Sequence, residues 1–216
     1  MDIDAIIFDL DGTLWDSCRV VAESWGKTLR QLGCADWEPK PETISGIMGM
    51  TAEEITAALF SRYGERGREI CLQCIHGENE YIARHGGDLY PGVRETLAAL
   101  WEIWPLFIVS NCLEGYIECF LESSGLGPLF RDHVCEGDTG LKKAGNIRLL
   151  AERHGLEHPV YVGDTAADER SAREAGCPFV FASYGFGKAE RPDAAIAAFA
   201  ELPAAIDALR GGNARV

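Results

Sequence analysis

The chain has 216 residues, of which 47% are hydrophobic and 25% are charged, which suits a globular protein with a full core or a main domain plus a smaller insertion. Its formal net charge of −14 argues against nucleic acid or an anionic membrane as the main partner, because both require clustered lysine and arginine. No secretion signal or membrane-spanning apolar run is evident, and the eight cysteines are scattered, as in proteins with reduced thiols. The cytoplasm is therefore the expected location, and the oligomeric state is left open.

Short apolar runs alternate with helical patterns along most of the chain. The runs cover residues 6–10, 106–110, 132–135, 160–163 and 179–182, and the helical patterns cover 92–103, 113–123, 143–154 and 168–175. Continuous apolarity is typical of parallel strands that are buried on both faces. The alternation predicts an α/β fold, a doubly wound parallel sheet with a Rossmann-like core.

One interval breaks this alternation. Between residue 15 and about residue 88 there is no strand candidate, only helical patterns at 17–33, 51–62 and 66–84. This stretch is too long for a crossover connection, so we expect an inserted α-helical cap domain of residues 15–88 and a core of residues 1–14 and 89–216. The loop Ser45–Thr51 joins two helical patterns, and its role is left open between an ordinary interhelical turn and a part in choosing a substrate. Four tryptophans are expected in core or interface packing: Trp15, Trp25, Trp101 and Trp104.

Polar side chains follow several of the predicted strands. Asp9 and Asp11 end the first strand, and Ser110 and Asn111 end the second. Asp164 follows the fourth strand, with Asp168 four residues further on, and Lys142 and Lys143 precede a predicted helix. Since parallel strands present their carboxyl ends at one edge of a sheet, these groups are expected to meet in one crevice.

The chemistry of this group favours a metal and a phosphate. Several carboxylates this close cannot all stay charged unless a cation neutralises them, and oxygen-only ligands suit Mg²⁺. The Ser110 hydroxyl and the amides at a helix start are anion donors. Two aspartates one residue apart can divide the work, one attacking phosphorus and the other handling the proton of the leaving group.

Four motifs in this order resemble those of the haloacid dehalogenase superfamily, in its phosphoglycolate-phosphatase-like branch with a helical cap. They are DxDGT at Asp9–Thr13, an apolar strand ending in serine at Phe107–Asn111, a lysine, and GDxxxD at Gly163–Asp168. The resemblance covers nearly the whole chain. It implies that Asp9 is the nucleophile and forms an aspartyl-phosphate, and that Asp11 is the general acid and base. It also implies a Mg²⁺ ion held by Asp9, the backbone carbonyl of Asp11 and Asp164, with Asp168 supporting the ion directly or through water.

The resemblance further implies that Ser110, Asn111 and a lysine hold the phosphate. Many relatives carry this lysine before a proline, and here neither candidate does. Lys143 is favoured because Lys143–Ile147 is similar to a KxxNI variant of this branch, which leaves Lys142 as a surface residue.

Asp11 also indicates the substrate class. Dehalogenases in the resembled superfamily lack an aspartate at this position, whereas an alcohol leaving group needs an acid. We therefore expect a Mg²⁺-dependent phosphatase of a small phosphorylated metabolite, with phosphoglycolate as the named candidate. The alternatives are a phosphomutase of the β-phosphoglucomutase kind and, from another class, a signalling switch phosphorylated on Asp9.

Overall fold

The structure, a computed structural model, describes residues 2–211, and its centre is a parallel sheet of six strands. The strand order is β5-β4-β1-β6-β7-β8, and every neighbouring pair is parallel. The strands are β1 (Ala5–Phe8), β4 (Leu106–Ser110), β5 (Asp132–Cys135), β6 (Pro159–Gly163), β7 (Phe179–Ala182) and β8 (Ala194–Ile196). Strands β1, β4 and β6 are buried along their whole length, as their continuous apolarity predicts. The doubly wound α/β fold is confirmed.

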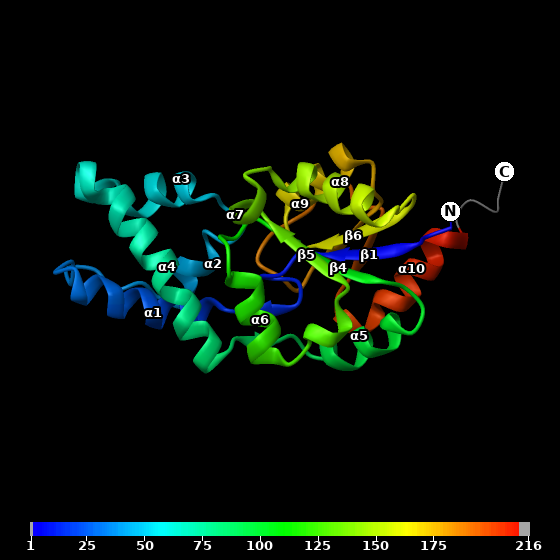
Figure 1. Cartoon of the computed structure of the whole chain (residues 1–216), viewed down its shortest axis with the longest axis horizontal. Coiled ribbons are helices and arrows are strands. Elements are labelled where there is room, and N and C mark those ends of the chain that lie inside the picture. The colour runs from blue at the N-terminus through cyan, green and yellow to red at the C-terminus, as the bar shows by residue number, and fades with distance from the viewer. Residues whose placement is uncertain (1, 212–216) are drawn as a thin grey trace.

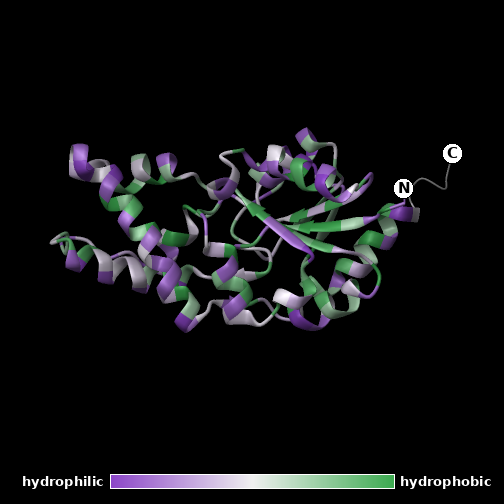
Figure 2. Ribbon diagram, in the orientation of Figure 1, coloured by the Kyte–Doolittle hydropathy of each residue, from purple (hydrophilic) through white to green (hydrophobic). Residues whose placement is uncertain are grey.

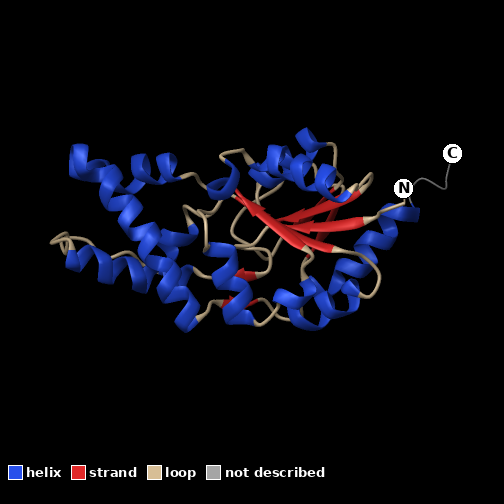
Figure 3. Cartoon of the chain, in the orientation of Figure 1, coloured by secondary structure: helices blue, strands red, loops and turns tan. Residues whose placement is uncertain are grey.

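Helices cover both faces of this sheet (Figures 1 and 3). Side chains of β1 alternate between two hydrophobic cores, because successive residues of a strand point to opposite faces. Ile6 and Phe8 pack in the core that includes α5 (Val93–Trp101) and α10 (Leu202–Gly211). Ile7 packs in the core that includes α8 (Lys143–His154) and α9 (Ala166–Ala175). The apolar strands in the middle of Figure 2 are thus enclosed between two helical layers.

A second group of helices lies beyond the carboxyl ends of the strands, at the end of the molecule opposite the N-terminus (Figure 1). It contains α1 (Cys18–Gln31), α2 (Pro41–Ser45), α3 (Ala52–Ile55) and α4 (Gly67–His85), with a π-helical turn at Thr56–Phe60 and a 3₁₀ turn at Ser61–Arg66 between α3 and α4. Helix α1 packs along α4, and the Trp25 and Phe60 rings, both buried, lie 5.7 Å apart between centroids. These rings belong to the same hydrophobic cluster as Ile6 and Phe8 of β1, so apolar packing continues from the sheet into this group of helices.

The two connections between these helices and the sheet run side by side. Strand β2 (Trp15–Asp16) pairs with β3 (Asp88–Leu89) in an antiparallel arrangement, with Trp15 opposite Leu89. Gly87 has no side chain here, and a Cβ atom would lie 2.7 Å from the Trp15 ring. The sequence predicted no strand between residues 15 and 88, because two-residue strands are too short to show a periodic pattern.

Other short elements also escaped the sequence analysis. They are β8, α2, α7 (Glu136–Thr139), α10, and the 3₁₀ turns Gly127–Leu129 and Phe199–Glu201. Helix α6 (Tyr116–Ser124) was predicted, but it begins three residues later than the expected residue 113. Strand β8 consists of two alanines and an isoleucine, so its apolar signal is weak. Trp101 is 49% exposed and does not pack in the core, which leaves interface packing as the part of its expectation that stays a prediction; it lies one residue past the buried Leu100, on another side of α5. None of the helices within residues 2–211 combines the length and apolarity needed to cross a membrane.

Candidate active site

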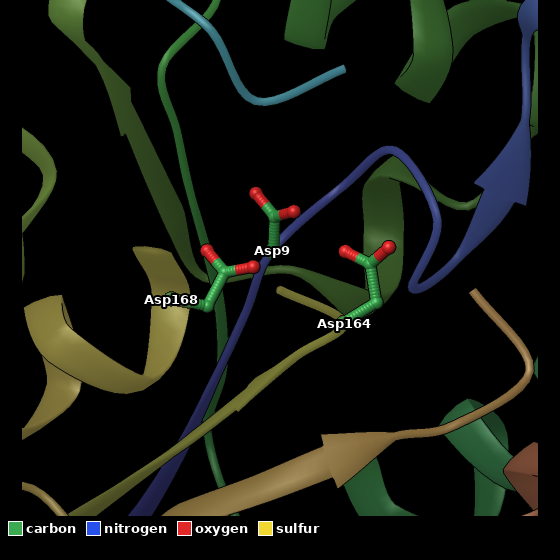
Figure 4. Close-up of side chains that lie close together, drawn as sticks. All are labelled: Asp9, Asp164 and Asp168. Carbon is green, nitrogen blue, oxygen red and sulfur yellow. The ribbon is translucent and has the colours of Figure 1, made fainter. Parts of the chain in front are cut away.

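Three aspartates converge at the carboxyl edge of the sheet (Figure 4). Asp9 follows β1, Asp164 follows the neighbouring strand β6, and Asp168 lies in the first turn of α9. All three are buried, and one carboxylate oxygen from each lies within 4.8 Å of the others. The parallel pairing of β1 with β6 brings Asp9 and Asp164 together, since their strands end side by side.

A single lysine balances part of this charge. Lys143 is the first residue of α8 and only 4% exposed, and its Nζ donates to Asp9 Oδ1 at 2.8 Å and to Asp168 Oδ1 at 2.5 Å. Lys142 precedes the helix and is exposed to solvent. Burial lowers the Lys143 pKa, but the Asp168 and Asp9 carboxylates outweigh it and raise the pKa well above its ordinary value. The structure therefore places Lys143, and not Lys142, in the cluster.

Two carboxylate oxygens of the cluster have no partner in the described part of the chain. Asp164 Oδ1 is buried without a hydrogen bond, while Asp164 Oδ2 accepts one from the Phe186 amide at 2.7 Å. Asp9 Oδ2 accepts none within residues 2–211. Asp168 differs, because both of its oxygens accept hydrogen bonds, from Lys143 and from Thr165. A buried unpaired oxygen of Asp164 and a second unpaired oxygen on Asp9 suit a hard cation such as Mg²⁺.

The pKa values of the same carboxyl groups indicate their mutual repulsion. Burial raises the pKa of Asp9 well above its ordinary value, and the neighbouring Asp168 adds to this rise against the opposing effect of Lys143. Burial also raises the pKa of Asp164 to about 7, again with a contribution from Asp168. One lysine is not enough to neutralise three buried carboxylates. A divalent cation would stabilise all of them in the ionised form.

Gly12, in the middle of the DxDGT motif, makes room for this arrangement. Its φ of +82° lies in the left-handed region that favours glycine, and an added Cβ atom would overlap Asp164 Oδ2. The glycine therefore allows the chain after Asp11 to turn directly beside the Asp164 carboxylate.

Asp11 is held by three donors on one oxygen. Its Oδ1 accepts hydrogen bonds from Trp15 Nε1 at 3.0 Å, Ser17 Oγ at 2.6 Å and Tyr116 Oη at 2.9 Å. Its Oδ2 accepts none from the residues that the structure describes, so it is the oxygen available to carry a proton. Burial raises the pKa of Asp11, whereas the three hydrogen bonds lower it. Sequence reasoning missed all three donors: Trp15 was interpreted as a packing residue, and no signal linked Tyr116 to the motif.

Ser110 and Asn111 lie where β4 ends. Ser110 is 5% exposed, and its Oγ accepts a hydrogen bond from the Cys112 amide at 3.4 Å. Asn111 Nδ2 donates to the Gly49 carbonyl at 3.1 Å, which joins this strand end to the loop Ser45–Thr51. Residues 47–50 of that loop line the same cavity as Asp9, Asp11, Ser110 and Lys143. The loop is thus a wall of the cavity.

Helices α1 and α4 form another wall of this cavity. Trp25 and Glu78 both line it, and Trp25 Nε1 donates to Glu78 Oε2 at 2.5 Å. Glu78 is only 7% exposed. The sequence analysis did not identify Glu78, because nothing in the helical pattern of residues 66–84 marks one glutamate among several as buried.

The fold and this cavity are those of a hydrolase that acts on phosphoric monoesters. The chain belongs to the haloacid dehalogenase-like hydrolases: the family model with the description "Haloacid dehalogenase-like hydrolase" matches residues 6–182.

Individual relatives agree with this assignment. The chain is 32% identical to the phosphoglycolate phosphatase of Photobacterium profundum, over 91% of this chain and 93% of that one. It is also 32% identical to the phosphoglycolate phosphatase of Chromobacterium violaceum, over 93% and 95% of the two chains. Among solved structures, a predicted phosphoglycolate phosphatase from Haemophilus somnus matches with a TM-score of 0.81 at 22% identity, covering 94% of this chain and 97% of that one.

Proposed function

We propose that this chain is a Mg²⁺-dependent phosphatase of a small phosphorylated metabolite, which works through an aspartyl-phosphate on Asp9. The observation that carries this proposal is the pair of aspartates at one cavity. Asp9 has one oxygen held by Lys143, while Asp11 has one oxygen held by three donors and the other without a partner among the described residues. Each carboxylate is thus oriented, with one oxygen left for chemistry.

The reaction divides between these two residues. A carboxylate oxygen of Asp9 forms a bond to phosphorus as the bond from phosphorus to the ester oxygen breaks, and protonated Asp11 gives its proton to that leaving oxygen. The Asp11 carboxylate then takes a proton from water, whose oxygen attacks phosphorus and releases phosphate and the Asp9 carboxylate. Burial raises the pKa of Asp11, which favours the protonated form that the first step requires.

Mg²⁺ would be held by Asp9, the backbone carbonyl of Asp11 and Asp164. Asp164 Oδ1, buried and without a hydrogen bond in the described chain, supports this assignment. Asp168 would act mainly by positioning Lys143, since both of its oxygens are already hydrogen-bonded. The ion would supply positive charge for the phosphoryl oxygens and for the crowded carboxylates.

Ser110, Asn111 and Lys143 would bind the phosphate. Ser110 and Lys143 are buried beside Asp9 and line the cavity, where a hydroxyl and an ammonium are suitable donors to phosphoryl oxygens. Asn111 also contacts the loop Ser45–Thr51 through Gly49.

Residues 15–88 would act as a cap over a core of residues 1–14 and 89–216. The pairing of β2 with β3 supports these boundaries, because it joins the two chain connections at residues 15–16 and 88–89. Closure of the cap would exclude bulk water during the attack on phosphorus. The names of the relatives make phosphoglycolate the first substrate to test.

The test is the substitution Asp9→Asn. Phosphate release should fall to background while the far-ultraviolet circular dichroism stays close to that of the parent, because the amide oxygen can still accept from Lys143 and Asp168 remains as its charged partner. Asp207→Asn is the matched control, since Asp207 is 70% exposed on α10. Near-normal release by the Asp9 variant would refute the nucleophile assignment. Multiple turnovers without a bisphosphate activator would separate the phosphatase from a phosphomutase, and a long-lived phosphoprotein without turnover would favour a switch.

A further inference from the structure

The cap side of the active-site cavity is apolar except for one carboxyl group. Five aliphatic side chains line it together with Trp25 and Glu78, namely Val21, Ile44, Ile47, Ile55 and Ile75. Among the lining residues, all in the described part of the chain, the one cation is Lys143, which already bonds to Asp9 and Asp168. A substrate bound with its phosphate at Asp9 would place its organic part against this apolar wall.

Glu78 is the polar feature of that wall. It comes from α4 and is 7% exposed, and its Oε2 accepts the hydrogen bond from Trp25 Nε1 that fixes its orientation. Its Oε1 has no hydrogen bond to any residue from 2 to 211. A buried carboxyl with one oxygen held and the other unpaired has a hydrogen bond to offer to a ligand in the cavity.

We propose that Glu78 selects phosphate monoesters whose organic part is apolar and ends in a hydroxyl or an amine, and that the cap wall disfavours esters with a second anionic group such as a carboxylate. This inference rests on the proposed phosphatase function and names its substrate class. A hydroxyl or an amine can hydrogen-bond to Glu78 Oε1. A substrate carboxylate would bring a negative charge against this apolar wall, where the lining holds no cation to compensate for its lost hydration.

The ionisation of Glu78 is consistent with this role. Burial raises its pKa to about 8, against the lowering effect of the Trp25 hydrogen bond. The uncharged carboxyl can exchange hydrogen bonds with a hydroxyl, and it can ionise when an ammonium group binds. A substrate hydroxyl and a substrate ammonium would both bind at Glu78 Oε1, so the geometry does not choose between them. The experiments below do.

A matched series of two-carbon esters tests the proposal. The kcat/KM for phosphate release is measured with 2-hydroxyethyl phosphate, 2-aminoethyl phosphate and phosphoglycolate, which differ only in the group at the far end. The hydroxyl ester, the amine ester or both should exceed phosphoglycolate by about tenfold or more. The reverse order would overturn the proposal.

Variants of Glu78 show whether this residue causes the preference for the hydroxyl or amine ester over phosphoglycolate. Glu78→Ala should reduce the advantage over phosphoglycolate by about tenfold, whereas a purely structural role would lower all three values in the same ratio. Glu78→Gln should lose only the amine ester if an ammonium is bound, and should keep both esters if a neutral hydrogen bond suffices. Glu80→Gln, an exposed residue of the same helix paired with Arg84, should change no ratio. Equal effects of Glu78→Ala on all three esters would overturn the assignment.

para-Nitrophenyl phosphate, a general phosphatase substrate, shows whether a negative result overturns only the Glu78 inference or also the proposed phosphatase function. Its hydrolysis together with a preference for phosphoglycolate would overturn this inference and leave the proposed function standing. No release from any of the four esters, in the presence of Mg²⁺, would overturn the proposed function and the inference with it.

Discussion

The hydroxyl of Tyr116 lies 2.9 Å from Asp11 Oδ1 and 2.9 Å from Ser17 Oγ, and Ser17 Oγ in turn lies 2.6 Å from Asp11 Oδ1. Tyr116 starts α6 in the core, whereas Ser17 lies just before α1. The proposed acid and base is thus oriented by residues from both sides of the β2–β3 connection, which ties its position to the placement of the first cap helix.

Tyr116→Phe should weaken catalysis and shift its pH dependence. The tyrosine hydrogen bond lowers the Asp11 pKa, so its loss raises that pKa further above the ordinary value. Asp11 must be protonated to donate to the leaving oxygen, so the alkaline limb of kcat/KM should move to higher pH. Poorer orientation should also lower the maximal kcat/KM by roughly tenfold.

The control for this substitution is Tyr81→Phe. The Tyr81 hydroxyl donates to the exposed Glu23, away from the cavity, so its loss should leave the pH profile unchanged. An unshifted alkaline limb in the Tyr116 variant would contradict the assignment of Tyr116 as a positioning residue for Asp11.

Lys143→Met should be far more damaging than Lys142→Met, although the two lysines are adjacent. Removing the Lys143 ammonium leaves Asp9 and Asp168 buried without their cation. Loss of one partner of a buried ion pair costs about 3 kcal/mol or more in the free energy of unfolding, and loss of a phosphate donor should lower kcat by about a hundredfold or more.

Urea unfolding and phosphate release measure both effects. The Lys142 variant should match the parent in each, because Lys142 is exposed before the helix. Equal losses in the two variants would show that the lysine geometry of the site has been assigned to the wrong residue.

The positions of the site aspartates could be predicted because their signals are local. Strands β1, β4 and β6 are continuous apolar runs, and Asp9, Ser110 and Asp164 stand at or directly after their ends. Once the strands are taken as parallel, the topology alone brings these ends to one edge of the sheet. The apolar pattern alone does not choose between Lys142 and Lys143, because the choice depends on which of the two side chains points inward at the start of α8. The resemblance to a KxxNI variant favoured Lys143, which is the lysine that contacts Asp9 and Asp168.

The groups that orient the site could not be predicted in this way. Tyr116 and Asp11 are separated by 105 positions, and Trp25 and Glu78 by 53. The first contact depends on how α6 packs beside the loop after β1, and the second on how α1 packs along α4. Trp15 and Trp25 are indeed buried, as expected, but the expectation took no account of their indole N–H groups. A buried tryptophan usually finds a hydrogen-bond partner, and here both partners are carboxyl groups at the cavity.

Removal of Mg²⁺ should abolish activity, and its return should restore it. EDTA is therefore expected to stop phosphate release, and Mg²⁺ in excess is expected to bring it back. Mg²⁺ should also raise the thermal midpoint of the parent protein, because an ion that binds only the folded state stabilises that state. Activity that survives chelation would contradict the metal assignment.

Asp164→Asn tests whether Asp164 is one of the Mg²⁺ ligands. The amide keeps an acceptor for the Phe186 N–H but lacks the charge that Asp164 Oδ1 would present to the ion. The rise of the thermal midpoint with Mg²⁺ should therefore shrink or vanish, together with activity. The exposed Asp207→Asn control should keep both, and an unchanged Mg²⁺ response in the Asp164 variant would remove this residue from the proposed ligand set.

Glu78 should make the protein less stable as the pH rises from 5 to 7. Its pKa is raised from 4.5 to about 8 in the folded chain, so between these values the folded state keeps a proton that the unfolded state has lost. The unfolded state then binds fewer protons, and the free energy of unfolding falls with pH, by about 2 to 3 kcal/mol over this interval for one such group. The Glu78→Gln side chain cannot ionise and keeps an acceptor for Trp25, so the free energy of unfolding of this variant should fall less with pH, by that amount.

Urea unfolding at both pH values, with Mg²⁺ in excess to hold the site aspartates ionised, measures the difference. Parallel curves for parent and variant would mean that Glu78 is ionised in the folded protein.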